Sequence, residues 1–391
     1  MRQTKHMATP IKILTVVGAR PQIIKAAAIS RAMEEGFATA MDETILHTGQ
    51  HYDENMSRVF FQELGVPEAD VQLNVGSGSH GAQTARMMEG IEVQLLKARP
   101  DVVLLYGDTN STLAGAVAAA KLHIPVAHVE AGLRSWNKAM PEEINRITCD
   151  HCSTWLFCPT QTAVSNLERE GFSTTPPAKP SANAPAVHMN GDVMFDNSMH
   201  FSMLAEQRST ILRDLGLSSE GYALVTVHRD HNTDIPDHLN GIFEALLEIV
   251  NAHRLPMVLP VHPRLRKCMA TVLDPRLRAA VGSSKDMHLI PPAGFLDMIQ
   301  LERNAQLVLT DSGGVQKEAF FFGKPCVILR PETEWVELVQ HGQAVLAGAD
   351  RDRIITSAAH FLSVGVPACS PLFGDGHAAQ SVCEVLVKDL G

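Results

Sequence analysis

Polar residues whose chemistry suits proton transfer follow several apolar runs of the sequence. Asp108 comes after the run 102–106, Glu130 after 126–129 and His228 after 224–227. Carboxylates and imidazoles are the side chains that most often act as general acids and bases. A solvated turn or a helix cap explains any one of these positions taken alone. Together they predict acid–base groups at the ends of several strands.

The segment 310–318 is the most specific local signal for a bound ligand. A strand is expected to run into Ser312, Gly313 and Gly314 and then into a helix. Free N–H groups and the positive end of the helix dipole suit a phosphate at such a turn, and glycine lets the backbone approach it closely. Glu318, one turn further into the helix, is placed to accept hydrogen bonds from ribose hydroxyls. The alternative is a serine cap with the glutamate on the helix surface.

A second strand-to-helix turn is expected at positions 18–21. Its Arg20, together with Lys25 further along the helix, has the charge to hold a diphosphate. His262 follows another apolar run, at 258–261, and is a further strand-end candidate.

Another helix is expected to begin at Pro141, with Glu142 and Glu143 in its first turn. Proline at the first helical position and acids near the positive end of the dipole are ordinary helix-start chemistry. Glu142 and Arg146 are four residues apart and share a helix face. They form either a surface ion pair or a carboxylate held beside a cation within a site.

The segment 149–152 contains Cys149 and Cys152, and Cys158 follows. This spacing resembles half of a zinc site. No second pair with this spacing follows, and both cysteines fall on an expected helix. We therefore interpret them as structural thiols and expect no metal.

Short β-branched runs alternate with helical runs along the chain, which is typical of an α/β fold with parallel sheets. Strands are expected at 11–17, 44–47, 101–106, 126–129, 155–157, 222–227, 256–260, 288–290, 306–309 and 326–329. The stretch 173–185 holds four prolines and is expected to be a linker or surface loop at a domain boundary. We expect two Rossmann-like domains, at 1–185 and 186–370, and a final helix within 371–391 that packs back on the first domain.

The composition narrows the class of protein. The chain has 391 residues, of which 45% are hydrophobic and 19% charged, so it is neither disordered nor fibrous. Its formal net charge is −10 and no run of Lys and Arg stands out, so nucleic acid and membranes are not expected partners. The seven cysteines in a chain without a secretory signal favour a cytoplasmic protein with reduced thiols.

Taken together, these motifs resemble the non-hydrolysing UDP-N-acetylglucosamine 2-epimerase family. They occur in the family's order from residue 11 to about 350. The matching stretches are Gly18-Ala19-Arg20-Pro21 with Lys25, Thr48-Gly49-Gln50-His51, Gly107-Asp108-Thr109, the run 128–134, Pro141-Glu142-Glu143 with Asn145-Arg146, the run 225–229, and Thr310-Asp311-Ser312-Gly313-Gly314 with Glu318.

The resemblance implies a glycosyltransferase-B-like fold, a UDP-sugar in the interdomain cleft and usually a homodimer. It implies inversion at C2 of UDP-N-acetylglucosamine without metal or nicotinamide, to give UDP-N-acetylmannosamine. UDP is eliminated across C1–C2 to leave 2-acetamidoglucal, and then adds back as a proton returns to the other face of C2.

By the same resemblance, Asp108, Glu130 and Glu142 are the acid–base candidates, and His228 assists at the diphosphate or in proton transfer. The expected substrate-binding residues are Arg20, Lys25, Arg134, Arg146, Arg229, His262, Ser312, Gly313, Gly314 and Glu318.

The sequence departs from the usual family pattern at several places. Met140 precedes Pro141 where the family has tryptophan, and Trp335 and Val336 stand where it usually has arginine and proline. The segments 137–145 and 334–337 look more like the subgroup that acts on UDP-2,3-diacetamido-2,3-dideoxyglucuronate. That substrate, a UDP-sugar glycosyltransferase of the same fold and a non-catalytic UDP-sugar-binding protein are the alternatives.

Overall fold

The computed structural model describes residues 9–50 and 68–391, and these residues form two compact units. The first unit comprises the chain up to Asn197 together with Pro371–Gly391, and the second is Ser198–Ser370. The first unit runs past the expected boundary at 185, because strand β7 (Ala186–Met189) pairs in parallel with β6 (Trp155–Cys158). The proline-containing stretch 173–185 is therefore a loop inside the first unit and does not link two domains.

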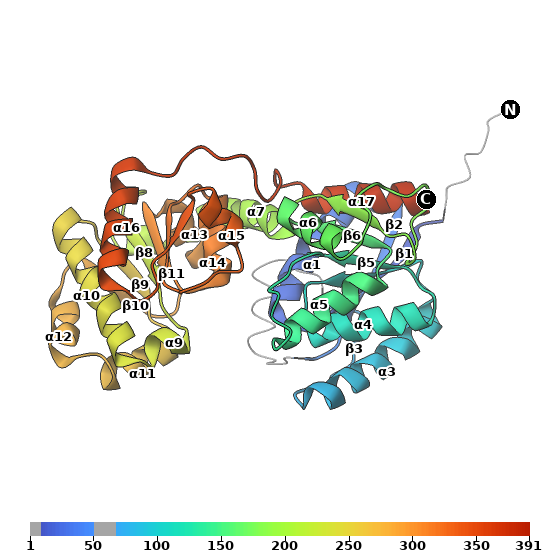
Figure 1. Cartoon of the computed structure of the whole chain (residues 1–391), viewed down its shortest axis with the longest axis horizontal. Coiled ribbons are helices and arrows are strands. Elements are labelled where there is room, and N and C mark those ends of the chain that lie inside the picture. Colours follow the sequence, from blue (N-terminus) through green and yellow to red (C-terminus); the bar gives the residue numbers. More distant parts are fainter. Residues whose placement is uncertain (1–8, 51–67) are drawn as a thin grey trace. The chain divides into compact units, whose positions relative to one another are not determined.

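The first unit is built on a parallel sheet of seven strands (Figure 1). Their order across the sheet is β3-β2-β1-β4-β5-β6-β7. Every residue of β4 is buried, as expected for a central strand covered on both faces. Besides β6 and β7, the strands of this sheet are β1 (Ile11–Val17), β2 (Met41–His47), β3 (Val71–Gln72), β4 (Val102–Tyr106) and β5 (Val126–Val129).

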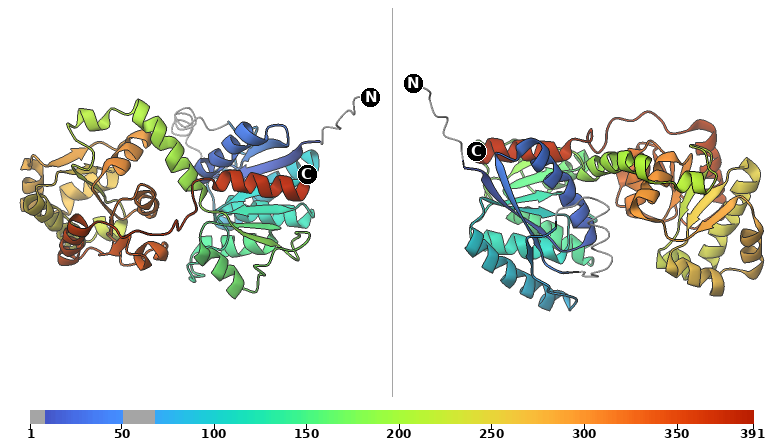
Figure 2. Two further views of the ribbon diagram at one scale, coloured as in Figure 1. Left: turned by 90° about the horizontal axis from the view of Figure 1, so that it is seen from above. Right: turned by 180° about the vertical axis from the view of Figure 1, so that it is seen from behind.

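Helices cover both faces of this sheet (Figures 1 and 2). Helices α3, α4 and α5 pack together on one face, whereas α17 packs against α1 on the other. The helices are α1 (Arg20–Ala32) with its π-helical continuation η1 (Met33–Phe37), α3 (His80–Ala98), α4 (Asn110–Lys121), α5 (Pro141–Cys152), α6 (Gln161–Arg169) and α17 (Ala378–Leu390).

The second unit contains a parallel sheet of six strands in the order β10-β9-β8-β11-β12-β13. They are β8 (Ala223–Thr226), β9 (Met257–Pro260), β10 (Met287–Ile290), β11 (Leu307–Thr310), β12 (Cys326–Ile328) and β13 (Ala344–Leu346). Helix α7 (Val193–Arg208) leads into this unit. Its other helices are α8 (Ile211–Asp214), α9 (Asp230–Thr233), α10 (Pro236–His253), α11 (Pro263–Thr271), α12 (Pro275–Ser283), α13 (Phe295–Asn304), α14 (Gly313–Phe321), α15 (Val336–Gln340) and α16 (Arg351–Val364).

Each sheet has a point at which the strand order reverses. In the first unit it lies between β1 and β4, and in the second between β8 and β11. Ligands of open parallel sheets bind beyond the carboxyl ends of the strands at such points. Arg20 and Asp108 follow the two strands of the first switch point, and His228 and Asp311 follow those of the second.

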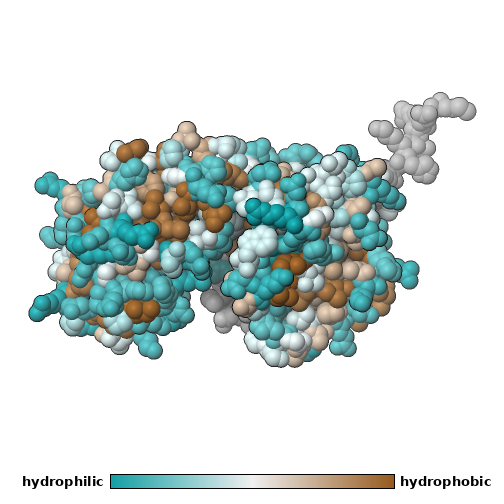
Figure 3. All heavy atoms as spheres, in the orientation of Figure 1, coloured by the Kyte–Doolittle hydropathy of each residue, from teal (hydrophilic) through white to brown (hydrophobic). Residues whose placement is uncertain are grey.

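Within the described ranges, no helix is long and apolar enough to cross a membrane. On the face shown in Figure 3, hydrophilic residues are interspersed with small apolar patches.

Candidate active site

The turn after β1 is held in place by the buried side chain of Gln22. Its Oε1 accepts hydrogen bonds from the backbone N–H groups of Gly18 and Ala19, at 2.9 and 3.2 Å. Its Nε2 donates to the carbonyl oxygen of Tyr106 at 2.9 Å, at the end of β4. Gln22 therefore links the ends of β1 and β4, the two strands of the switch point. Arg20, in the same turn, is exposed.

Lys25 and Glu130 form an ion pair beside this turn. Both side chains are largely buried, at 13% and 11% exposed. Burial alone lowers the pKa of Lys25, but the charge of Glu130 and their hydrogen bond more than offset it and raise the pKa above its ordinary value. A Cβ atom at Gly107 would lie 3.3 Å from Lys25 Nζ, so the pair sits directly against the turn that carries Asp108.

Asp108 pairs with Arg146 of helix α5, and its side chain is 34% exposed. Arg146 also donates to Glu143 Oε2 at 2.9 Å. The Asn145 side chain donates to the backbone carbonyl of Asp108 at 2.9 Å. Asp108 is thus an accessible carboxylate whose backbone and side chain are both held by the first turns of α5.

The expected pairing of Glu142 with Arg146 is wrong, because Glu143 takes that place. Glu143 is buried, and it accepts from the backbone N–H groups of Ser135 and Trp136, both at 2.9 Å. Burial alone raises the pKa of Glu143, but these hydrogen bonds lower it below its ordinary value. Glu142 is exposed on the neighbouring position of the helix.

Arg134 was expected to bind substrate, and the structure places its side chain inside the first unit. Its side chain is fully buried, and it contacts Asp150 and Glu170, each at 2.7 Å. Asp150 in turn lies 2.7 Å from His128. Its guanidinium is thus enclosed by carboxylates of the first unit, which gives Arg134 a structural role there.

In the second unit, Asp311 organises the end of β8. Its carboxylate accepts from the backbone N–H groups of His228 and Arg229, at 2.9 and 3.0 Å, and from the side chain of Asn232 at 3.1 Å. The His228 Nδ1 lies 2.9 Å from Asp311 Oδ1. Burial alone raises the pKa of Asp311, but these contacts with His228 keep it below its ordinary value.

This contact determines which nitrogen of His228 is available. Nδ1 donates to the carboxylate, so Nε2 is left to exchange protons or to bind a ligand. The His228 side chain is 36% exposed. The ring of His262 lies 6.0 Å from it, and His262 and Arg229 are both exposed.

The turn after β11 has the geometry of an anion site. Ser312 precedes helix α14, its side chain makes no capping hydrogen bond to the helix, and Gly314 is exposed. A Cβ atom at Gly313 would lie 2.2 Å from Glu334 Oε1, so the Glu334 carboxylate lies directly against this turn. A Cβ atom at Gly314 would lie 3.9 Å from Glu318 Oε2, which places that carboxylate next to the turn. The first N–H groups of α14 are thus available to a phosphate.

The side chain of Trp335 supports the turn after β11. It is buried, and its indole N–H donates to the carbonyl oxygen of Gly313 at 3.0 Å. The ammonium of Lys317 lies 4.1 Å from the centre of its ring. The tryptophan that replaces the usual arginine therefore braces the first turn of α14.

The carboxyl group of Glu302 is buried close to Glu318. Glu302 on α13 is 2% exposed, and its Oε2 has no hydrogen-bond partner. Burial, with a smaller contribution from Glu318, raises the pKa of Glu302 well above its ordinary value. Burial therefore favours the protonated form of Glu302.

Cys149 and Cys158 are buried and Cys152 is half-buried on or near α5. Within residues 9–50 and 68–391, no three His, Cys, Asp or Glu side chains are grouped so as to hold a metal ion. His51, part of a motif singled out above, lies outside these residues.

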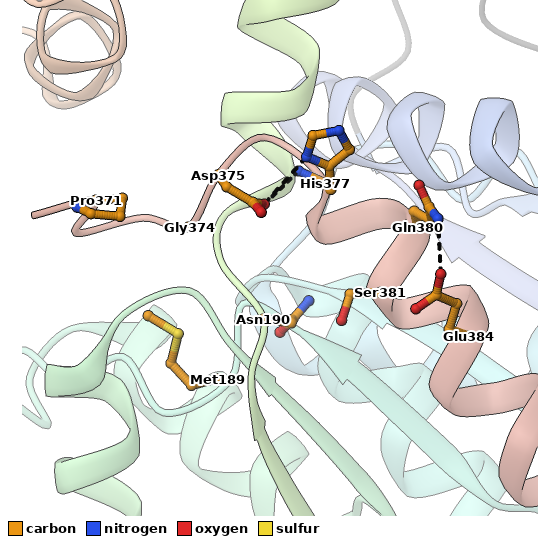
Figure 4. A pocket seen from close by; sticks show the side chains of 9 residues that line it. All are labelled: Met189, Asn190, Pro371, Gly374, Asp375, His377, Gln380, Ser381 and Glu384. Atoms are coloured by element: carbon orange, nitrogen blue, oxygen red, sulfur yellow. Dashed lines mark hydrogen bonds and ion pairs between the residues drawn. The ribbon is translucent and has the colours of Figure 1, made fainter.

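A cavity of about 590 Å³ opens at the start of α17 (Figure 4). Its polar side chains largely pair with one another, as Gln380 does with Glu384 at 2.8 Å. None of the candidate residues lines it. The complete lining is Met189, Asn190, Pro371, Gly374, Asp375, His377, Gln380, Ser381 and Glu384.

Several residues that shape the site were missing from the sequence-based set. Gln22, His128 and Asp150 are polar residues within helices or strands, and only their burial reveals a role. Glu143 and Asp311 stood inside the motifs but were passed over for their neighbours. The signal for Asp311 was its position directly after a buried strand.

The sequence and the fold both match known proteins. The family model described as UDP-N-acetylglucosamine 2-epimerase matches residues 36–387. A UDP-2,3-diacetamido-2,3-dideoxy-D-glucuronate 2-epimerase from Pseudomonas aeruginosa is 49% identical over 379 residues, which cover 97% of this chain and all of that protein.

Solved structures extend this likeness. A UDP-GlcNAc 2-epimerase from Methanocaldococcus jannaschii, in complex with UDP-GlcNAc and UDP, superimposes with a TM-score of 0.77 at 39% identity, covering 97% of this chain and 100% of that one. A UDP-forming trehalose-phosphate synthase from Burkholderia vietnamiensis shares the fold alone, with a TM-score of 0.55 at 12% identity over 98% of both chains. The expected glycosyltransferase-B-like fold is confirmed, and the chain belongs to the UDP-N-acetylglucosamine 2-epimerase family as a UDP-sugar 2-epimerase.

Proposed function

We propose that this epimerase inverts C2 of UDP-2,3-diacetamido-2,3-dideoxyglucuronate and forms the mannuronate epimer. The observation that carries the proposal is the 49% identity over 97% of the chain to the Pseudomonas aeruginosa enzyme of that name. The segments 137–145 and 334–337, which depart from the usual family pattern, agree with this subgroup.

Asp108 and Glu130 are proposed to move the proton at C2. That proton is weakly acidic, so its removal must be coupled to the departure of UDP from C1. Arg146 pairs with Asp108 and Lys25 pairs with Glu130, so each of the two carboxylates has a cation in contact with it. Glu142, at the start of α5, is a third candidate for the proton transfer.

The second unit is proposed to hold and release UDP. The N–H groups at the start of α14 would bind the diphosphate, with Ser312, Gly313 and Gly314 forming the turn and Glu318 accepting from the ribose. His228, oriented by Asp311, would stabilise the charge that develops on the leaving diphosphate. Other proposed contacts to the UDP-sugar are Arg20, Arg229 and His262.

The proposed reaction needs neither a metal ion nor a nicotinamide. Elimination and re-addition of UDP leave the oxidation state of the sugar unchanged overall, and protein carboxylates supply the proton transfers. Treatment with a chelator should therefore leave turnover unchanged. Loss of activity that only a divalent ion restores would contradict this part of the proposal.

The deciding experiment is proton NMR of the purified enzyme in deuterium oxide with each UDP-sugar in turn. The expected result is inversion at C2 of the diacetamidoglucuronate, with deuterium entering C2. UDP-N-acetylglucosamine is the second candidate, favoured by the likeness to the Methanocaldococcus jannaschii structure. Faster turnover of that sugar would replace the first proposal, and exchange with neither sugar would contradict both.

We also propose that the chain forms a homodimer. Val93 and Leu96 on α3 are 57% and 55% exposed, an apolar surface of the kind that subunits cover. Light scattering coupled to gel filtration should give twice the chain mass of 42.5 kDa. A single-chain mass at micromolar concentration would contradict this.

A further inference from the structure

His128 is bonded on both sides although it is completely buried in the middle of the first sheet. Its Nδ1 lies 2.7 Å from Asp150 Oδ1 and its Nε2 lies 2.8 Å from the carbonyl oxygen of Gly107. The side chains of His128 and Asp150 are both 0% exposed. Both contacts are therefore shielded from bulk solvent.

The two acceptors decide the protonation of the ring. A carbonyl oxygen can only accept, so Nε2 must carry a proton. Asp150 Oδ2 forms an ion pair with Arg134 at 2.7 Å and accepts from the Gly132 N–H at 3.2 Å, which are the contacts of an ionised carboxylate. Nδ1 must therefore carry a proton as well, and His128 is an imidazolium.

Charge balance supports the same state. Arg134 and the imidazolium are two cations, and Asp150 and Glu170 are two carboxylates in direct contact with them. A neutral His128 would leave this group with one excess negative charge, shared between the fully buried Asp150 and Glu170, whose side chain is 18% exposed. The other titratable groups that face the cluster are the Cys149 side chain, packed against the His128 ring, the buried Cys158 thiol close to Asp150 and Arg134, and His151, 3.7 Å from Glu170.

The pKa directions agree with this reading. Burial alone lowers the pKa of His128, but Cys149 and Asp150 raise it well above its ordinary value. Burial alone raises the pKa of Asp150, but His128 and Arg134 bring it below its ordinary value.

The bonded groups lie next to the proposed acid–base residues. Gly107, whose carbonyl His128 holds, has a φ of +60° and precedes Asp108. Gly132, held through Asp150, has a φ of +77° and comes two residues after Glu130, whose own φ is +72°. Glycine adopts this left-handed backbone freely, whereas at Glu130 it persists only where the surroundings fix it.

We propose that His128 is a doubly protonated positioning residue that clamps the two turns that carry Asp108 and Glu130. It touches neither substrate nor reacting atoms. It acts by fixing the separation of the two carboxylates across C2, and this last step rests on their proposed roles.

Neutron diffraction from crystals of the wild-type enzyme grown in deuterium oxide near pD 8 tests the protonation state without any variant. We expect deuterium on both Nδ1 and Nε2 of His128. His188 is the internal comparison, because its buried Nε2 has no partner and burial lowers its pKa. Deuterium on only one nitrogen of His128, or on a carboxyl oxygen of Asp150, would overturn the proposal.

Steady-state kinetics test the positioning role. In His128→Gln the amide can donate to only one of the two acceptors, and in Asp150→Asn the carboxylate that links His128 to Gly132 is lost. We expect kcat to fall by about 10-fold to 100-fold in each, the range for loss of supporting contacts, with KM and the Kd for UDP little changed. Leu95→Ala, a buried change on α3 away from the clamp, is the control for lost stability and should keep the wild-type kcat.

Each outcome decides a separate point. Wild-type kcat in folded His128→Gln and Asp150→Asn would refute the positioning role. A rise in KM equal to the fall in kcat/KM would assign His128 to substrate binding instead. If Asp108→Asn and Glu130→Gln both stay active, the proposed acid–base roles fail, while the neutron result still determines the state of His128.

Discussion

Glu130 takes a backbone conformation that residues other than glycine rarely adopt. Its φ is +72°, and its N–H and that of Ala131 both donate to the carbonyl oxygen of Phe157, at 3.1 and 3.0 Å. Strained residues of this kind cost on the order of 1–3 kcal/mol and cluster at functional sites. This backbone conformation ends β5 at Val129 and places the Glu130 carboxylate beyond the carboxyl end of the strand.

Removing either proposed acid–base charge should reduce turnover with little change in binding. Asp108→Asn and Glu130→Gln keep the shape of the side chain but cannot take up a proton. We expect kcat to fall by at least about 100-fold in each, the scale of one acid–base contribution. Isothermal titration with UDP should give a Kd near that of the wild type, whereas Arg20→Ala should weaken it. Glu89→Gln, exposed on α3, is the matched control. Near-normal turnover in both amide variants would refute the assignment.

The buried carboxyl group of Glu302 should make stability depend on pH. Because burial raises its pKa in the folded chain, its stabilising effect is complete below the unfolded value of about 4.3 and is lost as the pH rises through the folded value. Glu302→Gln removes this dependence. In chemical denaturation the variant should gain stability relative to the wild type from pH 5 to pH 8. The exposed Glu332→Gln should show no such trend, and an equal trend in both variants would contradict the prediction.

At the residue scale, the sequence predicts which chemical groups follow the strands better than it predicts the contacts that hold those groups in place. The positions of Asp108 and His228 could be predicted because each stands two residues after the end of an apolar strand. Glu142 and Glu143 could not be told apart, because which of them turns inward depends on how α5 packs. The enclosure of Arg134 was invisible for the same reason, since Asp150 and Glu170 lie far from it in the sequence.

At the scale of the element, helix α14 depends on a side chain from the following loop. The Trp335 N–H donates to Gly313, and Thr333, just before Trp335, donates to Gln316 at 2.6 Å. The loop at 333–335 thus fixes the direction of the first turn of α14, and so of the N–H groups proposed to bind the diphosphate.

Replacing Trp335 should therefore weaken UDP binding in two steps. Trp335→Phe keeps a ring beneath Lys317 but loses the hydrogen bond, and Kd should rise by about 3-fold to 10-fold. Trp335→Leu also loses the cation–π contact, and Kd should rise by about 10-fold to 100-fold. Trp155→Phe, which removes an indole hydrogen bond in the first unit, should leave Kd unchanged. Equal effects of the Phe and Leu variants would show that the ring contact has no part in binding.

Most long elements could be predicted, and the omissions share a cause. Strands β3, β7 and β13, which were not predicted, lie at sheet edges and are two to four residues long, whereas the four-residue edge strand β10 was predicted. β7 was also hidden by the prolines just before it, which made 173–185 resemble a link between domains. Edge strands are specified by the neighbour they pair with, and that neighbour is distant in the sequence.

At the scale of the whole molecule, the first unit is made of two separate parts of the chain. Helix α17 returns to it after the second unit and packs against α1 (Figure 2). The Asp196 carboxylate accepts from the N–H groups of Ala378 and Ala379, and Asp389 accepts from Trp155 at 2.8 Å. Both ends of α17 are therefore fastened to the first unit.

A cavity in α17 should destabilise the first unit alone. Leu386 is completely buried, and Leu386→Ala should lower the unfolding free energy of that unit by about 2–5 kcal/mol. Calorimetry should show one transition moved to lower temperature and the transition of the second unit unmoved. The exposed Lys388→Ala is the control. A shift of both transitions together would show that the units unfold as one.

The late position of α17 also has a consequence for biosynthesis. A ribosome that has finished Asn197 must still make the whole second unit before α17 emerges. At about 5–20 residues per second this takes about 10–40 s. During that interval the nascent first unit exposes the face of α1 that α17 will cover, whereas the second unit, continuous in the chain, has all its parts as soon as it leaves the ribosome. The first unit thus begins to be translated first but is completed last, and chaperones can bind it during that interval.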